Sequence, residues 1–231
     1  MKRMTANFYP ASEPKNGYIG KADITIGNAI RLNGISVFKS PEHGINISFP
    51  EFGDGASYVV PKSKEAYAAM LEVVSMATIN DKHFGYNTGE YGVHMDVKGK
   101  MVNEPYADGR FSVEVDDVCV LYGITTRNVE FEKEGKDRSF TAVDLPTIGS
   151  YEKDGETQYQ TAFEGRISSW KDKEGKDQSI DYGQRLTGLV RAERKALIKE
   201  RKPSLDEQMK GADARKGEAV ENNGLEKEVN R

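Results

Sequence analysis

The sequence has little cysteine, histidine and tryptophan, and it has no long apolar run. Its 231 residues include one cysteine, three histidines and one tryptophan. An intramolecular disulfide is therefore excluded, and a zinc site with clustered cysteine and histidine ligands is not expected. No apolar stretch reaches the roughly 20 residues that cross a membrane, and the N-terminal residues lack the apolar core of a secretory signal. We expect a cytoplasmic protein with no metal, no cofactor and no membrane contact.

The sequence also lacks the patterns that are typical of enzymes. It contains no phosphate-binding glycine loop and no nucleophile elbow, and His43, His83 and His94 are scattered. The single cysteine, Cys119, lies on the apolar face of an expected strand, where a thiol packs as a small apolar residue. We therefore predict no catalytic residues and no enzymatic activity.

What the sequence does contain is a pattern of amphipathic strands, centred on residues 20–38. Apolar residues alternate on both sides of Gly27-Asn28, which predicts two strands joined by a two-residue hairpin turn. After Gly34 the alternation moves from even to odd positions. A glycine at such a change of parity predicts a β-bulge, which keeps the apolar face of the strand toward the core.

The same pattern returns 89 positions later, in residues 109–127. Gly34 aligns with Gly123, and Asp116-Asp117 takes the place of the first turn. Any two amphipathic hairpins align to some degree, but the shared glycine favours an internal repeat. The apolar alternation of residues 93–97 matches residues 4–8 at the same offset. We expect Gly34 and Gly123 to occupy equivalent bulges.

These strands and two helical patterns define the expected fold. Apolar residues recur at helical spacing from about Ser63 to Thr78 and again over residues 184–200. The predicted fold class is α+β, with two tandem antiparallel four-stranded sheets, each followed by a helix. The expected units are residues 1–80 and 81–202. Residues 203–231 are polar and charged, which predicts a disordered C-terminal tail.

The N-terminal unit resembles the sporulation stage V protein G (septation regulator) family of small bacterial proteins. The residues that match the pattern of this family are Ala22, Ile24, Thr25, Ile26, Ile35, Val37, Phe49, Pro50, Val60 and Pro61. The resemblance implies a four-stranded antiparallel sheet followed by a helix, in a unit that dimerises and binds DNA or RNA as a regulator. Two copies in one chain imply an intramolecular pseudo-dimer, with a homodimer as the alternative. Family members commonly carry Ser and then Lys or Arg after the apolar-Pro pair, where this chain has residues 51–53 and 147–149.

Charge is unevenly distributed and suggests where nucleic acid would bind. Residues 81–165 carry a net charge of −8 and residues 166–202 a net charge of +5. The predicted nucleic-acid-binding residues are the cations of the second helix: Arg185, Arg191, Arg194, Lys195, Lys199, Arg201 and Lys202. Such a face can neutralise phosphates, although cations near a helix C-terminus also favour the helix dipole. Trp170 and the aromatic residues of the glycine-rich linker 80–92 can stack bases, but packing is the favoured role.

Two functions therefore remain open. The first is a DNA- or RNA-binding regulator of the septation-regulator type, which binds through the basic helix face. The alternative is a protein-interaction module of a phage or mobile element, which uses its acidic second unit on a basic partner.

Overall fold

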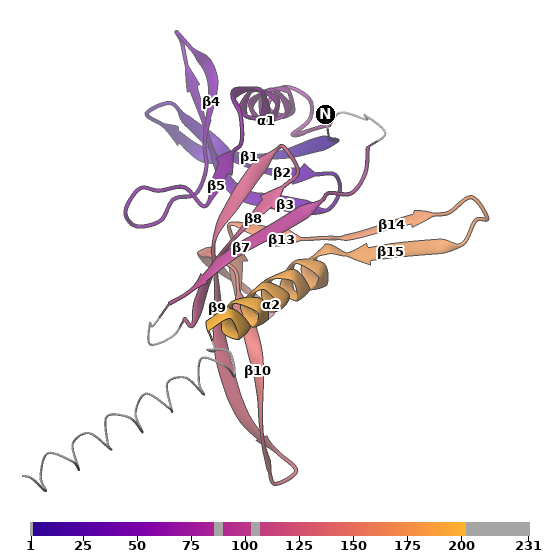
Figure 1. The fold of residues 1–231 in the computed structure, drawn as a ribbon. Helices are drawn as coiled ribbons and strands as arrows, with labels where there is room; N and C mark the ends of the chain where they lie inside the picture. Colours follow the sequence, from indigo (N-terminus) through magenta and orange to yellow (C-terminus); the bar gives the residue numbers. More distant parts are fainter. Residues whose placement is uncertain (1, 86–89, 103–106, 202–231) are drawn as a thin grey trace, which may run out of the picture. The chain divides into compact units, whose positions relative to one another are not determined.

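The computed structural model describes residues 2–85, 90–102 and 107–201, and Figure 1 shows the arrangement of their strands and helices. The fold is α+β, with antiparallel sheets and two helices. The chain divides into two compact units, Met1–Arg194 and Lys195–Arg231. The described part of the second unit is the end of the last helix, so Lys202 and the predicted tail 203–231 lie outside the described residues. No helix within the described part of the chain is long and apolar enough to cross a membrane.

The first sheet is built on a four-stranded antiparallel meander, as predicted. Its strands pair in the order β4-β3-β2-β1. They are β1 (Met4–Lys15), β2 (Tyr18–Ile26), β3 (Ile30–Ser40) and β4 (Gly44–Ser48). Helix α1 (Lys64–Ala77) packs on this sheet, and the Ser63 hydroxyl caps it by accepting a hydrogen bond from the Ala66 amide at 3.0 Å.

The second sheet repeats this meander with the order β10-β9-β8-β7. Its strands are β7 (Met95–Met101), β8 (Gly109–Val115), β9 (Cys119–Lys133) and β10 (Lys136–Asp144). Helix α2 (Tyr182–Arg201) begins two residues before the expected range. Its residues Tyr182, Leu186 and Val190 are buried along one side, which is the apolar stripe that the sequence predicts.

The two predicted bulges occupy equivalent positions, which confirms that expectation. In the first sheet Ala22 pairs with Ile35 and Ile24 with Leu32, so Asp23 faces two residues, Asn33 and Gly34. In the second sheet the pairs fall 89 residues later, and Ser112 faces Tyr122 and Gly123. Both glycines have positive φ, 68° at Gly34 and 84° at Gly123, a conformation that favours glycine over other residues.

The hairpin turns and first strands differ in detail from the predictions. Gly27 and Asn28 both have positive φ, but the ladder pairs Ile26 with Ile30, so the loop has three residues instead of two. The third, Ala29, is fully buried and fills core space. The offset of 89 was wrong for the first strands, because Met95 pairs with Val115 where Met4 pairs with Ile26. An even shift of two residues keeps the same strand face toward the core.

Each meander also receives a strand from the other half of the chain, so two four-stranded sheets is too simple a description. Strand β5 (Val59–Pro61) follows the first meander but pairs with β9, and β13 (Phe163–Gly165) follows the second but pairs with β3. Val59 pairs with Leu121 and Phe163 with Leu32, which are positions 89 residues apart. The exchange is therefore reciprocal and in the same register. Phe163, a large buried side chain, fills the core of the sheet that it joins.

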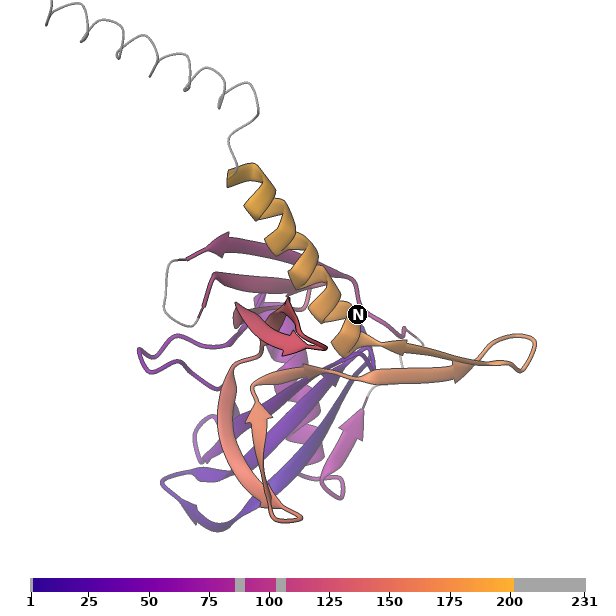
Figure 2. The ribbon, with the colours of Figure 1, turned by 90° about the horizontal axis from the view of Figure 1, so that it is seen from below.

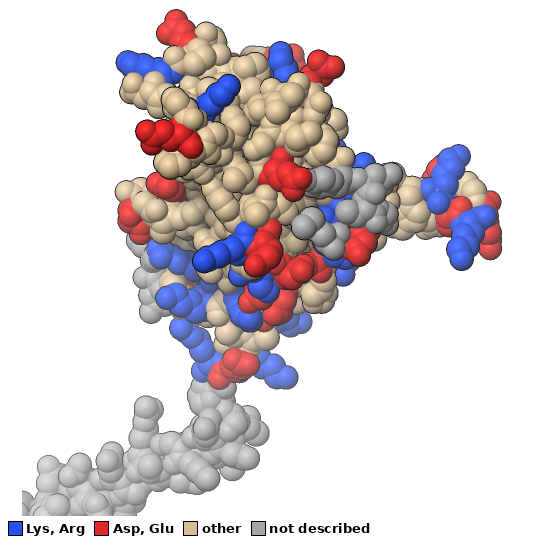
Figure 3. All heavy atoms as spheres, turned by 90° about the horizontal axis from the view of Figure 1, so that it is seen from above, with Lys and Arg blue, Asp and Glu red and all other residues tan. Residues whose placement is uncertain are grey.

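The remaining strands are additions to this plan. Strand β6 (His83–Gly85) pairs with the outer edge of β1. Two hairpins, β11–β12 (Thr147–Lys153 and Glu156–Thr161) and β14–β15 (Ile167–Lys171 and Asp177–Asp181), are inserted after the second meander. Residues 159–167 are divided among β12, β13 and β14. Figure 2 shows the β14–β15 hairpin projecting from the base of α2, and Figure 3 shows charges of both signs at its tip.

Candidate nucleic-acid interface

Two of the cations predicted to bind nucleic acid form hydrogen bonds with the second half of the chain. Arg191 Nε donates a hydrogen bond to the Thr141 carbonyl at 2.9 Å. Arg194 Nε donates to Asp108 Oδ2 at 2.9 Å, and Arg194 Nη1 donates to Thr141 Oγ1 at 3.1 Å. Partial burial acts to raise the pKa of Asp108, but hydrogen bonds from Arg194 and Thr126 prevail and lower it. These arginines are engaged within the protein.

The other predicted cations are spread along the helix. Arg185 is exposed in the first turn of α2, where its guanidinium lies 5.9 Å from the centre of the Tyr182 ring. Lys195, Lys199 and Arg201 are exposed residues of the second unit. The continuous basic face drawn from the sequence is therefore interrupted where Arg191 and Arg194 turn to protein partners.

A groove that the sequence analysis did not identify lies on the second sheet, with a volume of about 970 Å³. Val60 of β5 and Tyr122 of β9 line it with apolar surface, and both remain more than a third exposed. Three cations also line it, namely Lys98, Lys100 and Arg110, against one lining carboxylate, Asp54. The ladder pairs Lys100 with Arg110 across β7 and β8. We call this the cationic groove.

An aromatic pair borders the bulge beside the cationic groove. The rings of Phe52 and Tyr58 lie 4.0 Å apart between centroids. A Cβ atom at Gly123 would lie 2.9 Å from the Tyr58 ring, so the ring rests directly on the glycine. Phe52 lies in the segment after Pro50, so this segment presents aromatic surface beside the cationic groove.

The charges beside the cationic groove are partly organised by one carboxylate. Glu114 accepts hydrogen bonds from Lys62 Nζ at 2.8 Å and from Lys98 Nζ at 2.7 Å. These two ammonium groups lower the pKa of Glu114 to about 2, and the same hydrogen bond raises the pKa of Lys98. Lys100 has no hydrogen bond or ion pair with any of the described residues. Its ammonium is therefore the cation best placed to meet a ligand.

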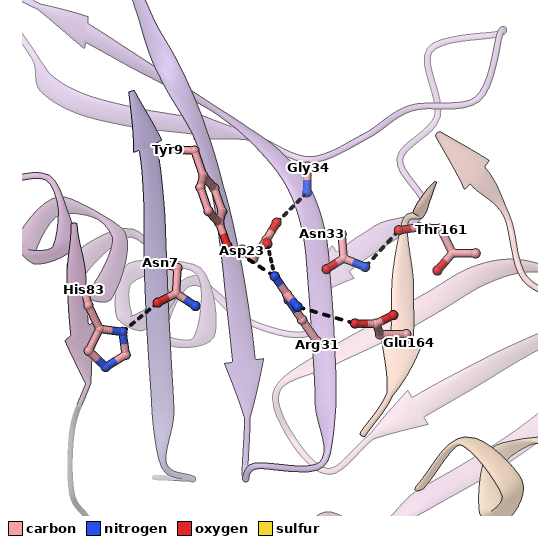
Figure 4. A network of polar contacts seen from close by, with 9 residues as sticks. All are labelled: Asn7, Tyr9, Asp23, Arg31, Asn33, Gly34, His83, Thr161 and Glu164. Carbon is pink, nitrogen blue, oxygen red and sulfur yellow. Dashed lines mark hydrogen bonds and ion pairs between the residues drawn. The ribbon is translucent and has the colours of Figure 1, made fainter. Parts of the chain in front are cut away.

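The equivalent face of the first sheet is closed by a polar network instead (Figure 4). Asp23 Oδ2 accepts a hydrogen bond from Arg31 Nη2 at 2.5 Å, and Asp23 Oδ1 accepts one from the Gly34 amide at 3.0 Å. Arg31 also donates to the Tyr9 hydroxyl at 3.2 Å and forms an ion pair with Glu164 at 3.6 Å. Asp23 is only 5% exposed. Burial and the neighbouring Asp23 raise the pKa of Tyr9.

The strand registers show which residues replace this network on the second sheet. Ser112 stands in the position of Asp23, Val120 in that of Arg31 and Val60 in that of Glu164. Small or apolar side chains thus replace the ion-paired groups, and the surface stays open. The sequence signal for the groove was the alternation Lys98-Gly99-Lys100, directly after the expected alternation of residues 93–97, and the net charge of −8 over residues 81–165 concealed it.

No group of three or more metal-ligating side chains occurs within the described ranges. No protein-family model, curated protein or solved structure matches this chain at a significant level.

Proposed function

We propose that the protein binds single-stranded nucleic acid in the cationic groove of its second sheet. The observation that carries this proposal is the combination, in one groove, of three cations with the exposed ring of Tyr122. Proteins that bind single strands use a positively charged groove for the phosphates and aromatic side chains for the bases. Lys98, Lys100 and Arg110 would contact phosphates, and a base would stack on Tyr122.

A single strand suits this groove better than a duplex does. Stacking on Tyr122 needs an unpaired base with a free π-face, whereas a duplex offers protein side chains mainly its backbone and groove edges. The acidic residues elsewhere in the second half would repel a second strand. Phosphate contacts carry little sequence information, so we expect weak sequence preference. The exposed cations of α2, among them Arg185 and Lys195, would attract nucleic acid at longer range.

The resemblance to septation regulators supports a regulatory role for this binding. Under this proposal the chain acts as a DNA- or RNA-binding regulator in the bacterial cytoplasm. The reciprocal exchange of β5 and β13 supports the further proposal that one chain is an intramolecular pseudo-dimer, because each sheet is completed by the other half. Light scattering should then show a monomer at micromolar concentration, and a stable dimer would contradict the pseudo-dimer.

The binding proposal can be tested by fluorescence anisotropy with a labelled oligonucleotide over a range of salt concentrations. If the three cations neutralise three phosphates of a single strand, the log–log slope of affinity against salt is about −2. Tyr122→Ala should weaken binding by roughly 5- to 150-fold, which corresponds to about 1–3 kcal/mol for one stacked base. Equal affinity for single strand and duplex, together with no effect of Tyr122→Ala, would overturn the proposal.

A second candidate function is binding to a basic protein partner, and exposed aromatic residues on the hairpins favour it. Phe131 and Phe140 pack edge to face at 5.9 Å near the end of the β9–β10 hairpin, and both are more than 40% exposed. Tyr159 on β12 is 70% exposed. Such rings among acidic residues are typical of protein interfaces. Loss of partner capture by Phe131→Ala with Phe140→Ala, while oligonucleotide affinity stays unchanged, would support this second function as a separate one.

A further inference from the structure

A second cavity lies away from the cationic groove, where three separate segments of the chain meet. It has a volume of about 560 Å³ and is lined by Asn28, Tyr91, Ser168, Trp170 and Tyr182, among others. Asn28 belongs to the first hairpin turn, Tyr91 to the segment before β7, and Ser168 and Trp170 to β14. This volume is within the range of small-molecule sites. We call it the aromatic pocket.

The aromatic pocket has exposed rings on which a flat ligand can stack. Trp170 is 46% exposed and Tyr91 is 56% exposed. Ile180, which pairs with Ser168 across β14 and β15, adds apolar lining. The surface therefore suits a planar aromatic group.

Polar groups in the same pocket are left without protein partners. Tyr182 is 3% exposed, yet its hydroxyl makes no hydrogen bond with any residue that the structure describes. Asn28 Nδ2 donates to Ser168 Oγ at 3.2 Å, and the Asn28 carbonyl oxygen Oδ1 remains without a partner in the described ranges. Neither oxygen is among the fully buried side-chain atoms that lack a hydrogen bond, so both stay accessible. A donor and an acceptor are thus available for the edge of a heterocycle.

Two arginines place positive charge beside this pocket. The Arg3 guanidinium lies 4.8 Å from the centre of the Tyr91 ring, and the Arg185 guanidinium lies 5.9 Å from that of Tyr182. Arg3 Nε is buried and has no hydrogen-bond partner among the described residues. An anionic group attached to the aromatic ligand would meet these cations. The chemistry that fits all three observations is a nucleobase that carries a phosphate.

We propose that the aromatic pocket binds a nucleotide, whose base stacks on Trp170 and hydrogen-bonds to Tyr182 and Asn28. The β14–β15 hairpin that supplies Trp170 has no counterpart after β5, where the chain passes directly into α1. The pocket therefore belongs to one side of the repeated fold only. The nucleotide can be free or part of a single strand. The site is separate from the cationic groove and does not depend on it.

The single tryptophan makes a direct test possible. Because Trp170 is the only tryptophan, the ¹⁵N-labelled full-length protein gives one indole N–H cross-peak. We expect titration with AMP, GMP, CMP and UMP to shift this cross-peak saturably, whereas ribose 5-phosphate leaves it in place. Two variants keep Trp170 as the probe and should each weaken binding. Tyr91→Ala should do so by roughly 5-fold or more if the Tyr91 ring stacks on the base, and Tyr182→Phe should do so because it removes the hydroxyl.

A second arm uses a short single-stranded oligonucleotide and the groove variant Lys100→Ala. If the oligonucleotide shifts the indole cross-peak of both the wild type and Lys100→Ala, the pocket takes a base from a strand. If only mononucleotides shift it, the ligand is a free nucleotide. In either case the Lys100→Ala variant should bind mononucleotides as tightly as the wild type does. The proposal for the aromatic pocket can therefore hold even if the cationic groove does not bind a single strand. An indole cross-peak that no nucleotide or oligonucleotide moves, or that ribose 5-phosphate moves equally, would overturn the proposal.

Discussion

The outer faces of the two sheets are built on equivalent strands, but one face is closed by a polar network and the other is open. On the first sheet, Asp23 and Arg31 close the face with a partly buried ion pair, and Arg31 also contacts Tyr9 and Glu164. On the second sheet, Ser112 and Val120 stand in their places and leave the cationic groove.

The contrast shows that the two sheets share one arrangement of strands while the side chains on their outer faces differ. Bulges, hairpin loops and exchanged strands recur in matching register on both sheets, because they are required to complete each core. The side chains on the outer face are not needed for that purpose. A charged pair closes this face on the first sheet, and small and apolar groups in its place leave the face of the second sheet open.

The largest effect on stability is expected from breaking the closed face. Asp23→Ala removes the carboxylate that holds the Arg31 guanidinium and the Gly34 amide. The substitution leaves the buried Gly34 amide without its acceptor and removes the nearest carboxylate from the partly buried Arg31, so we expect a loss of about 3 kcal/mol in the free energy of unfolding. The matched substitution on the open face, Ser112→Ala, should cost about 0.5 kcal/mol or less. Urea denaturation measures both, and equal losses would show that the two faces do not differ energetically.

A smaller effect, equal on both sheets, is expected at the bulges. Gly34→Ala and Gly123→Ala each force a side chain into positive φ, which costs about 1–3 kcal/mol. The new Cβ would also lie 2.5 Å from Ile148 Cδ1 in the first sheet and 2.9 Å from the Tyr58 ring in the second. Gly149→Ala is the control, because that glycine has open space around it. A bulge variant as stable as the control would contradict the equivalence of the two sites.

The smallest effect is expected from releasing Lys98 into the cationic groove. Glu114→Gln removes the charge that holds the Lys98 ammonium at 2.7 Å. Affinity for a single-stranded oligonucleotide should then rise severalfold at low salt, because the Lys98 ammonium no longer has to leave Glu114 in order to contact phosphate. Anisotropy titration measures the gain. Unchanged or weaker binding would indicate that Lys98 does not contact the strand.

The same variant has a pH signature. The pKa of Glu114 is lowered to about 2 in the folded protein, against an ordinary value of 4.5. Its contribution to stability is therefore present above about pH 4.5 and is lost as the pH falls toward 2. Wild type should lose more stability than Glu114→Gln across this acid range, as measured by urea denaturation at several pH values. Parallel pH profiles would contradict the charge pairing.

Much of the fold follows from local sequence patterns. Alternation predicts the strands around Gly27-Asn28, the parity change predicts the bulges at Gly34 and Gly123, and the capping hydroxyl of Ser63 predicts the start of α1. The exchange of β5 and β13 could not be predicted in this way. A strand of three residues carries no signal for its partner, and its pairing is decided by which sheet edge its apolar side chains can complete.

The candidate site was harder to predict than the fold. The cations of α2 have helical spacing, but the spacing does not reveal that Asp108 and Thr141 bind two of them. Conversely, Lys98, Lys100 and Arg110 lie in an acidic stretch and meet only through strand pairing. The net charge of a segment sums the side chains on both faces of a strand. A cluster of positive charges on one face is therefore hidden when acidic residues lie on the other face or nearby.

The central claim, that the second sheet binds a single strand and the first does not, is tested most directly by paired charge removals. The variant Lys100→Ala with Arg110→Ala empties the groove, and Lys21→Ala with Lys39→Ala removes two exposed cations from the first sheet. Measured by anisotropy at low salt, the groove variant should lose roughly 100-fold in affinity, about tenfold for each charge-assisted contact, and the salt slope should fall by about 1.4. The first-sheet variant should bind like wild type. Equal losses in the two variants, or no loss in either, would contradict the claim.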